Sequence, residues 1–304
     1  MAGTQPAYHL ASTALAKVGD ISITGRHLGN LAEGIGEELA NERDNRTDTY
    51  FAQDLPRERT KPDMPIALAT VSIDGGRMQT RADGGPNGVQ DPHWRETKNA
   101  LFMRMTGVAF EDDPHPALPE CFRDRRYMKK LLAGLADEGD FAPDTAHDKR
   151  KSDLQSWRPE RLFRTCLSSL CDSHSFGRMM EAEADSRGFF HAMKQAFVAD
   201  GLQYNWTIQQ KHFPTFTPIL DFPHAIERIY EVARALHGSS ERVWEEYVKW
   251  ITAVWQGRVA DVLQDLRREQ SQRGEPPQDC EDKDPRQVLA ETITYLENNQ
   301  SRMD

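Results

Sequence analysis

The stretch Phe197-Val198-Ala199-Asp200-Gly201 decides the fold that this sequence predicts. It reads as a buried strand that ends in an acidic residue, and a helical segment and a second strand, Ile219-Leu220-Asp221, follow it. A carboxylate at the carboxyl end of a strand reaches the crevice of an α/β sheet, where such folds place ligands and metals. Asp200 is therefore a candidate metal ligand.

A second segment upstream has the same form. Residues 66–73 are an apolar run, which Asp74-Gly75-Gly76 closes. We expect a buried strand over this run, a turn at Gly75-Gly76, a short partner strand over residues 77–81 and a third strand over residues 97–106. Two aspartates at strand ends predict one divalent-metal site, because Mg²⁺ prefers oxygen ligands.

The composition is that of a globular protein, with 38% hydrophobic residues among 304. A run of about 18 apolar residues and a secretory leader are both missing from the sequence, so we expect neither a membrane protein nor a secreted one. Four scattered cysteines do not form a disulfide framework and favour a reducing cytoplasm. The net charge of -10 argues against a nonspecific nucleic-acid coat, but it is compatible with a nuclease-type site beside local basic surfaces.

Three regions are expected along the chain. Residues 1–60 form an N-terminal helical region, residues 61–224 an α/β core with a polar insertion at about 110–160, and residues 225–304 an all-helical region. The insertion does not read as core.

Within the first region, helical signals cover residues 8–17 and 27–45 around a Gly-containing turn. This pair is either a DNA-reading helix-turn-helix or a small helical bundle. The polar segment 44–61 reads as a linker.

The order of the elements predicts a mixed α/β fold. Three strands able to pair antiparallel precede a helix that Ser173 caps and Gly188 ends; a strand, a helix and a strand follow. This is the order of an RNase H-like domain, which would place Asp74 on its first strand and Asp200 on its fourth. Nucleotidyl transferases of this kind use carboxylates to hold two Mg²⁺ ions roughly 3.5–4 Å apart.

The chain resembles the DDE transposases of bacterial insertion sequences, most closely the ISKra4-like group and more distantly Mutator-type enzymes. The resemblance covers roughly residues 20–303 and is weakest across 110–160. The matching text is Val71–Gly76, Trp94–Lys98, Phe176-Gly177 with Gly188, Val198–Gly201 with Trp206, Ile219–Ala225 and Tyr295–Met303.

This resemblance implies Mg²⁺-dependent cleavage at transposon ends and strand transfer into target DNA, with Mn²⁺ as a substitute cation. It also implies a homo-oligomer that works on DNA in the nucleoid. Asp221, followed three residues later by His224, is similar to the Mutator-type signature and implies a role flanking the active site. Judged from the residues alone, Asp221 equally suits a helix cap with His224 packed on the first turn.

The family's third acid is a glutamate on a helix beyond the helical region, and the sequence ends at Asp304 before reaching such a segment. The resemblance therefore implies an incomplete triad; Glu297 belongs to the preceding segment. Three functions stay open: a DDE transposase incomplete in this chain, a catalytically inactive DNA-binding or regulatory remnant, and a metal-dependent hydrolase unrelated to DNA. We also expect an exposed apolar patch within 225–303.

Two further groups have chemical interest. Cys166, Cys171 and His174 have the residue types of a zinc site but lack a fourth ligand at useful spacing, so no zinc site is expected. A basic run in the insertion suits either phosphate contacts or a solvated helix face, and we treat it as a possible DNA-binding surface; it comprises Arg123, Arg125, Arg126, Lys129 and Lys130.

Overall fold

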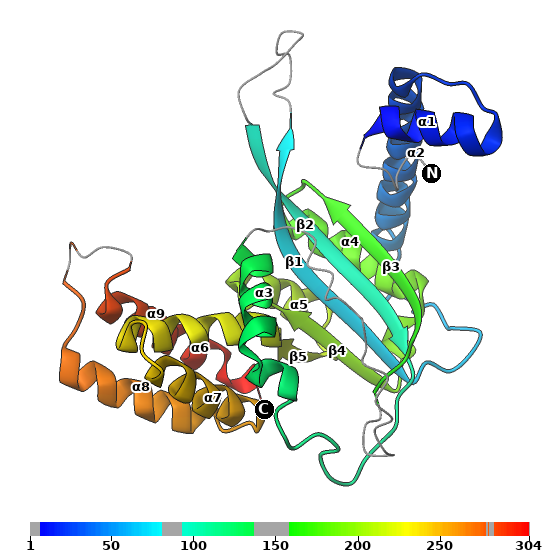
Figure 1. Ribbon diagram of the computed structural model, residues 1–304. Helices are drawn as coiled ribbons and strands as arrows, with labels where there is room; N and C mark the ends of the chain where they lie inside the picture. Colours follow the sequence, from blue (N-terminus) through cyan, green and yellow to red (C-terminus); the bar gives the residue numbers. More distant parts are fainter. Residues whose placement is uncertain (1–6, 81–92, 137–157, 278, 280–282, 304) are drawn as a thin grey trace.

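A computed structural model describes residues 7–80, 93–136, 158–277, 279 and 283–303. The protein is a mixed α/β structure in which a five-stranded sheet lies between an N-terminal helical pair and a layer of C-terminal helices (Figure 1). Within the described part of the chain, no helix is both long enough and apolar enough to cross a membrane.

The sheet has the strand order β3-β2-β1-β4-β5. The first three strands pair antiparallel, whereas β4 lies parallel to β1 and β5 lies parallel to β4. Their bounds are Leu68–Thr80 for β1, His93–Met105 for β2, Arg161–Ser169 for β3, Lys194–Ala199 for β4 and Thr217–Leu220 for β5.

The expected turn at Gly75-Gly76 is wrong. Strand β1 runs through both glycines to Thr80 and pairs with β2 without interruption, so residues 77–80 of the expected partner strand are the end of β1. Residues 81–92 lie outside the described residues. A glycine suits this position because a Cβ on Gly76 would meet Thr97 Oγ1 at 3.1 Å. The third strand is β3 rather than residues 97–106, of which 97–105 belong to β2.

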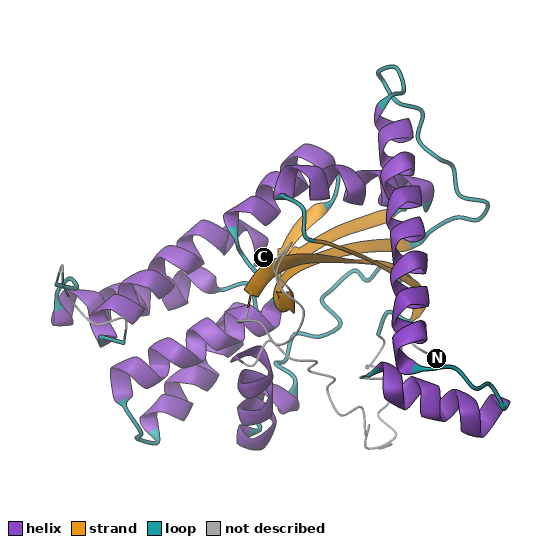
Figure 2. Ribbon diagram, turned by 90° about the horizontal axis from the view of Figure 1, so that it is seen from above, coloured by secondary structure: helices purple, strands orange, loops and turns teal. Residues whose placement is uncertain are grey.

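Helices α4 (Ser173–Ser186) and α5 (Gln203–His212) pack on one face of the sheet, and Figure 2 shows helices lying against that face. Side chains alternate between the two faces of a strand, so Val71 and Ile73 enter this core while Ser72 and Asp74 point to the opposite face. The core is completed by large buried side chains, which include Phe102, Phe176, Met180, Phe197, Trp206 and Phe213.

The cap of α4 differs from expectation. Asp172, not Ser173, is the N-cap residue, because its Oδ1 accepts a hydrogen bond from the Ser175 backbone N–H at 3.0 Å. Gly188 ends the helix as expected and has a φ of 69°, a left-handed conformation that favours glycine.

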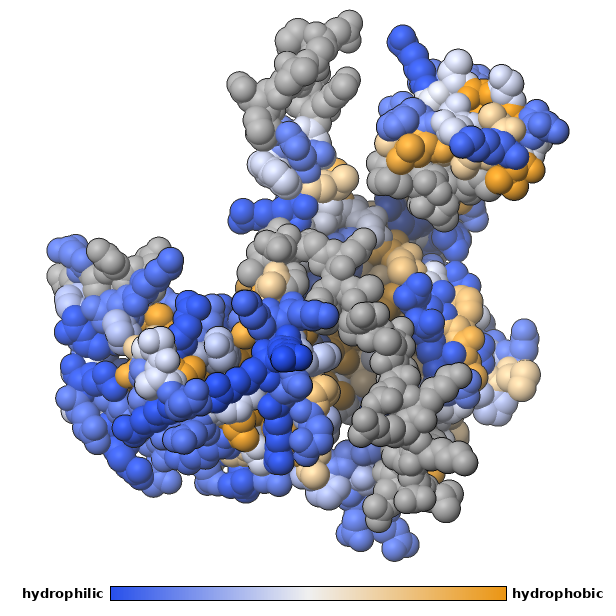
Figure 3. Space-filling view, viewed as in Figure 1, coloured by the Kyte–Doolittle hydropathy of each residue, from blue (hydrophilic) through white to orange (hydrophobic). Residues whose placement is uncertain are grey.

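The N-terminal pair consists of α1 (Tyr8–Gly19) and α2 (Gly25–Phe51). Residues 44–51 of the expected linker 44–61 are therefore helical. The Tyr50 hydroxyl donates a hydrogen bond to Glu181 of α4, which fixes the end of α2 to the core. Leu28 is buried, but the other members of the apolar stripe, Leu31, Ile35 and Leu39, are exposed. In Figure 3 hydrophobic residues are visible on this helical pair.

The C-terminal layer has a core of its own. It is built from α6 (Phe222–His237), α7 (Arg242–Trp255), α8 (Val259–Arg273) and α9 (Pro285–Asn299), and α3 (Arg125–Ala136) packs against them. The insertion therefore contributes to a core, contrary to expectation. Met128 and Leu131 lie one turn apart on α3 and are buried among these helices.

The expected apolar patch within 225–303 is also wrong: among the described residues of this range, no large hydrophobic side chain is exposed. In Figure 3 the helical layer is mostly hydrophilic. The physical reason is that α9 turns its apolar side to both cores. Tyr295 packs against each of them, and Met303 does the same.

Candidate metal site

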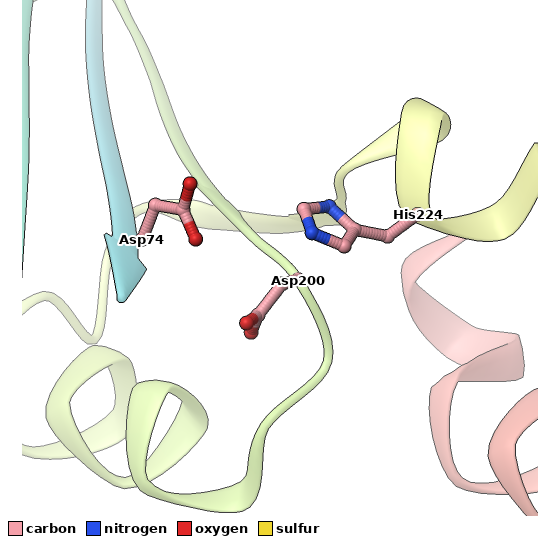
Figure 4. Close-up of side chains that lie close together, drawn as sticks. All are labelled: Asp74, Asp200 and His224. Atoms are coloured by element: carbon pink, nitrogen blue, oxygen red, sulfur yellow. The ribbon is translucent and has the colours of Figure 1, made fainter. Parts of the chain in front are cut away.

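Two neighbouring parallel strands bring the predicted acids together. Ile73 of β1 pairs with Ala199 of β4, so the next residues, Asp74 within β1 and Asp200 directly after β4, lie side by side. One ligand atom from each of Asp74, Asp200 and His224 lies within 4.8 Å of the others (Figure 4). The expectation that the two carboxylates come from adjacent strands and lie close together is confirmed, and a shared cation stays a prediction.

These three side chains border a cleft of about 480 Å³. Ser72 and Asp74 point away from α4 and α5, so the cleft opens on the other face of the sheet. Its lining comes from β1, β2, β3, β4 and the start of α6, and it includes Asn99, Leu101, Cys166, Ser168, Val198 and Asp221.

The Asp200 carboxylate is held from one side only. Its Oδ1 accepts hydrogen bonds from the Leu202 backbone N–H at 3.0 Å and from Asn205 Nδ2 at 2.8 Å, and Asn205 is fully buried. This leaves Oδ2 available for a ligand. The result is a carboxylate of fixed orientation with one uncommitted oxygen, as a cation site requires.

The loop after Asp200 is braced by the last helix. The Tyr295 hydroxyl donates to the Asp200 carbonyl at 2.9 Å, and the Trp206 indole N–H donates to Asn299 at 3.1 Å. Gly201 allows this contact because its φ is 98° and a Cβ there would lie 2.8 Å from the Tyr295 ring. Position 201 therefore requires glycine for two separate reasons.

His224 reaches the site from the first turn of α6. Its Nδ1 lies 2.7 Å from Asp221 Oδ2, and Figure 4 shows the ring turned towards the two aspartates. Asp221 occupies the N-cap position, but its side chain forms no capping hydrogen bond. The helix-cap interpretation of Asp221 is therefore wrong, and both residues expected to flank the site do so.

The electrostatics of the cleft favour a bound cation. Asp74 is exposed as a residue, yet enough protein surrounds its carboxylate that loss of hydration raises its pKa, and the negative charge of Asp200 adds to this rise. Burial alone would lower the pKa of His224. The hydrogen bond with Asp221 and the charges of the three aspartates outweigh that effect and raise the pKa of His224.

The structure keeps the other candidates out of this group. Glu297 lies on an exposed part of α9, where its Oε1 is 2.7 Å from Arg267, so it does not replace a third acid. His174 contacts Lys211 at 3.1 Å and Cys166 lines the cleft. Among the described residues the only set with metal-binding geometry is Asp74, Asp200 and His224.

The basic run lies on the helical layer beside the start of α6, where the rings of Phe122 and Phe222 are 5.2 Å apart. Arg125 pairs with Glu241, and Arg123 lies 3.7 Å from Glu120. The remaining members, Arg126, Lys129 and Lys130, are exposed. The run is a solvated surface next to the site and does not line the cleft.

Sequence reasoning missed Asn205 and Tyr204. An asparagine five residues after a strand-end aspartate, one turn into a helix, is the signal that identifies Asn205. Tyr204 lies near Gly75; burial, then the charges of Glu96, Asp200 and Asp74, raise its pKa to about 12. It is an uncharged neighbour of the cleft at neutral pH.

Comparison with known proteins adds no relative to this picture. No family model matches the chain, and no curated protein matches it. The function is therefore inferred from the residues of the site.

Proposed function

We propose that this protein is a DDE-type transposase of the ISKra4-like group, which acts on DNA by metal-dependent phosphoryl transfer at Asp74 and Asp200. The observation that carries the proposal is the placement of these carboxylates on β1 and directly after β4, the adjacent parallel strands of a β3-β2-β1-β4-β5 sheet. Three antiparallel strands followed by two parallel ones support an RNase H-like core for residues 61–224.

The two aspartates of the cleft fit Mg²⁺ or Mn²⁺. Both aspartates offer short, hard oxygen ligands, and the raised pKa of Asp74 means that a nearby cation would relieve an unfavourable negative charge. A divalent cation bound there supplies charge neutralisation at phosphate and lowers the pKa of the attacking water or hydroxyl. Asn205 and the Leu202 N–H hold Asp200 so that its orientation is set before a substrate arrives.

DNA as the substrate is supported by the surface next to Asp74. Strands β1 and β2 continue past the site as a two-stranded ribbon, seen at the top of Figure 1. On this ribbon Arg95 is exposed on the face of Asp74, whereas Arg77 and the ring of Trp94, which is 60% exposed, lie on the opposite face, where Glu96 is across from Arg77. Basic side chains beside an aromatic ring suit phosphates and nucleobases. The overall negative charge of the protein makes such a local basic surface more distinctive.

The test is strand cleavage and strand transfer on supercoiled plasmid in Mg²⁺ or Mn²⁺. The assay compares this chain with its Asp74→Asn and Asp200→Asn variants. We expect cation-dependent products, and Asp74→Asn or Asp200→Asn to reduce them by about two to three orders of magnitude, because a lost ligand costs several kcal/mol of barrier.

Glu297→Gln is the matched control, since Glu297 is an acid of the same helical layer that lies outside the cleft. It should leave the rate unchanged. Products that persist in Asp74→Asn, or that vanish in Glu297→Gln, would contradict the proposal.

A second candidate, a catalytically inactive DNA-binding or regulatory protein, is favoured by one observation. The third member of the ligand group among the described residues is a histidine and not a carboxylate. Cation-dependent DNA binding without cleavage would establish this alternative.

A further inference from the structure

We infer that His224 is the third protein ligand of the cation held by Asp74 and Asp200, that Asp221 positions it, and that the site therefore prefers Mn²⁺ to Mg²⁺. This inference rests on the cation site of the proposed function and adds a ligand, a positioning residue and a metal preference to it.

The distances fit a single ion. Oxygen and imidazole ligands bind divalent metals at about 2.0–2.2 Å, so two ligands of one ion are separated by at most about 4.4 Å. The ligand atoms of Asp74, Asp200 and His224 all lie within 4.8 Å of one another. A few tenths of an ångström of side-chain movement is enough to close the group around one cation.

The orientation of the imidazole is already the one that a ligand needs. Nδ1 is engaged by Asp221 Oδ2 at 2.7 Å, which leaves Nε2 as the nitrogen that can bind a metal. A metal-binding histidine normally donates its other ring N–H to a carboxylate in this way, and the carboxylate fixes both the tautomer and the ring orientation. Figure 4 shows the ring edge facing the carboxylates of Asp74 and Asp200.

Helix capping does not explain the position of the Asp221 side chain. It stands at the N-cap of α6, yet its carboxylate bonds the His224 ring instead of the free N–H groups of the helix. A capping contact would contribute about 1 kcal/mol to the helix. The residue forgoes that contact, as expected of a group that positions His224.

The donor set decides which cation is preferred. Mg²⁺ takes oxygen ligands and keeps several waters, whereas imidazole nitrogen suits first-row transition metals. Two aspartates and one neutral histidine provide mixed oxygen and nitrogen donors. Mn²⁺ accepts both, and three protein ligands leave positions open for water and a phosphate oxygen. The predicted preference for Mn²⁺ therefore depends on His224 alone.

The experiment is Mn²⁺ binding to the whole chain, followed by electron paramagnetic resonance with electron spin echo modulation, which detects a nitrogen bonded to the ion. The wild type should show coupling to ¹⁴N. His224→Gln should lose that coupling and bind Mn²⁺ about 10–100-fold more weakly, while its Mg²⁺ affinity changes less. Asp221→Asn should keep the coupling but weaken Mn²⁺ binding. His237→Gln, at the other end of α6, is the matched control and should behave as the wild type.

The outcomes separate this inference from the proposed function. Bound Mn²⁺ that disappears in Asp74→Asn but never shows ¹⁴N coupling would overturn the role of His224 and leave the two-aspartate cation site intact. A wild type that binds no Mn²⁺, or that binds it unchanged when both aspartates are replaced by asparagine, would overturn the cation site and the proposed function together. Because the wild-type spectrum decides the question, the conclusion does not depend on whether a variant folds.

Discussion

Two carboxylate–histidine pairs in this protein have the same short contact and opposite surroundings. Asp221 and His224 meet at 2.7 Å beside the cleft, and Glu181 and His212 meet at 2.7 Å between α4 and α5. The second pair is almost completely buried, whereas roughly a third of each side chain of the first pair is exposed. Equal geometry therefore serves two different purposes.

The difference lies in which oxygens are already bonded. Glu181 Oε1 accepts from the Tyr50 hydroxyl at 2.8 Å and lies 3.1 Å from Arg59, while Oε2 contacts His212. Although burial alone would raise the pKa of Glu181, these partners together lower it. The pKa of Asp74 in the cleft shifts in the opposite direction and is raised. A fully bonded carboxylate ties helices together, and one with a free oxygen is available to a ligand.

The largest effect on stability is expected from the Glu181 network. Glu181→Gln removes the negative charge that Arg59 and His212 contact, and breaking a buried, hydrogen-bonded ion pair costs about 3 kcal/mol. Urea unfolding should show this loss, with Mn²⁺ affinity unchanged. Glu297→Gln, which breaks an exposed pair with Arg267, should cost less than about 0.5 kcal/mol. Equal losses in the two variants would contradict the contrast between bonded and exposed carboxylates.

The same network makes a pH prediction. Because the folded-state pKa of Glu181 lies below its ordinary value of 4.5, its stabilisation is complete above about that pH and is lost as the pH falls through the folded pKa. The stability difference between the wild type and Glu181→Gln should be constant near neutrality and shrink below pH 4.5. A difference that grows in acid would assign the effect to another group.

A smaller effect is expected from the residue that positions Asp200. Asn205→Ala removes the Nδ2 donor to Asp200 Oδ1, and loss of such a hydrogen bond weakens metal binding by about 10–100-fold. Calorimetric titration with Mn²⁺ measures this change. Asn298→Ala, on an exposed part of α9, is the control and should bind Mn²⁺ normally. Unchanged affinity in Asn205→Ala would mean that Leu202 N–H alone holds the carboxylate.

The smallest expected effect is that of Asp74→Asn, which should stabilise the metal-free protein instead of destabilising it. The folded-state pKa of Asp74 is raised, so its ionisation opposes folding above that pKa, and the penalty disappears as the pH falls through it. Asp74→Asn should therefore stabilise the metal-free protein at pH 7 by roughly 1 kcal/mol or less, given the exposure of the residue. Thermal melts in a chelator should show a higher midpoint for the variant. Added Mn²⁺ or Mg²⁺ should raise the midpoint of the wild type only.

The sequence predicted the apolar strand segments that lead into Asp74 and Asp200, because apolar runs closed by an acid are local signals; only β4 ends there, whereas β1 continues to Thr80. It did not predict that β1 continues through Gly75-Gly76, because two adjacent glycines are a local signal for a turn. Only the pairing of these residues with β2 keeps them in a strand. The positions of Asp221 and His224 followed from the family resemblance. Their hydrogen bond and their distance to the aspartates are tertiary facts that no spacing rule contains.

The sequence also did not predict which apolar side chains of the helices are buried. Because the insertion is mostly polar, the sequence did not predict that Met128 and Leu131 are buried. Their burial depends on contacts with α6 and α7. Conversely, Leu31, Ile35 and Leu39 form a regular apolar stripe that remains exposed. Periodicity identifies a face of a helix, but it does not say whether another element covers that face.

The hydrogen bond between the Tyr295 hydroxyl and the Asp200 carbonyl also has a consequence for the order of events during translation. The two residues are 95 positions apart, and ribosomes add about 5–20 residues per second, so Tyr295 is made about 5–20 s after Asp200. Throughout that interval both aspartates exist while the loop that carries the second one has no support from α9. The Asp200 carbonyl therefore gains its hydrogen bond from α9 only after the helical layer has been translated.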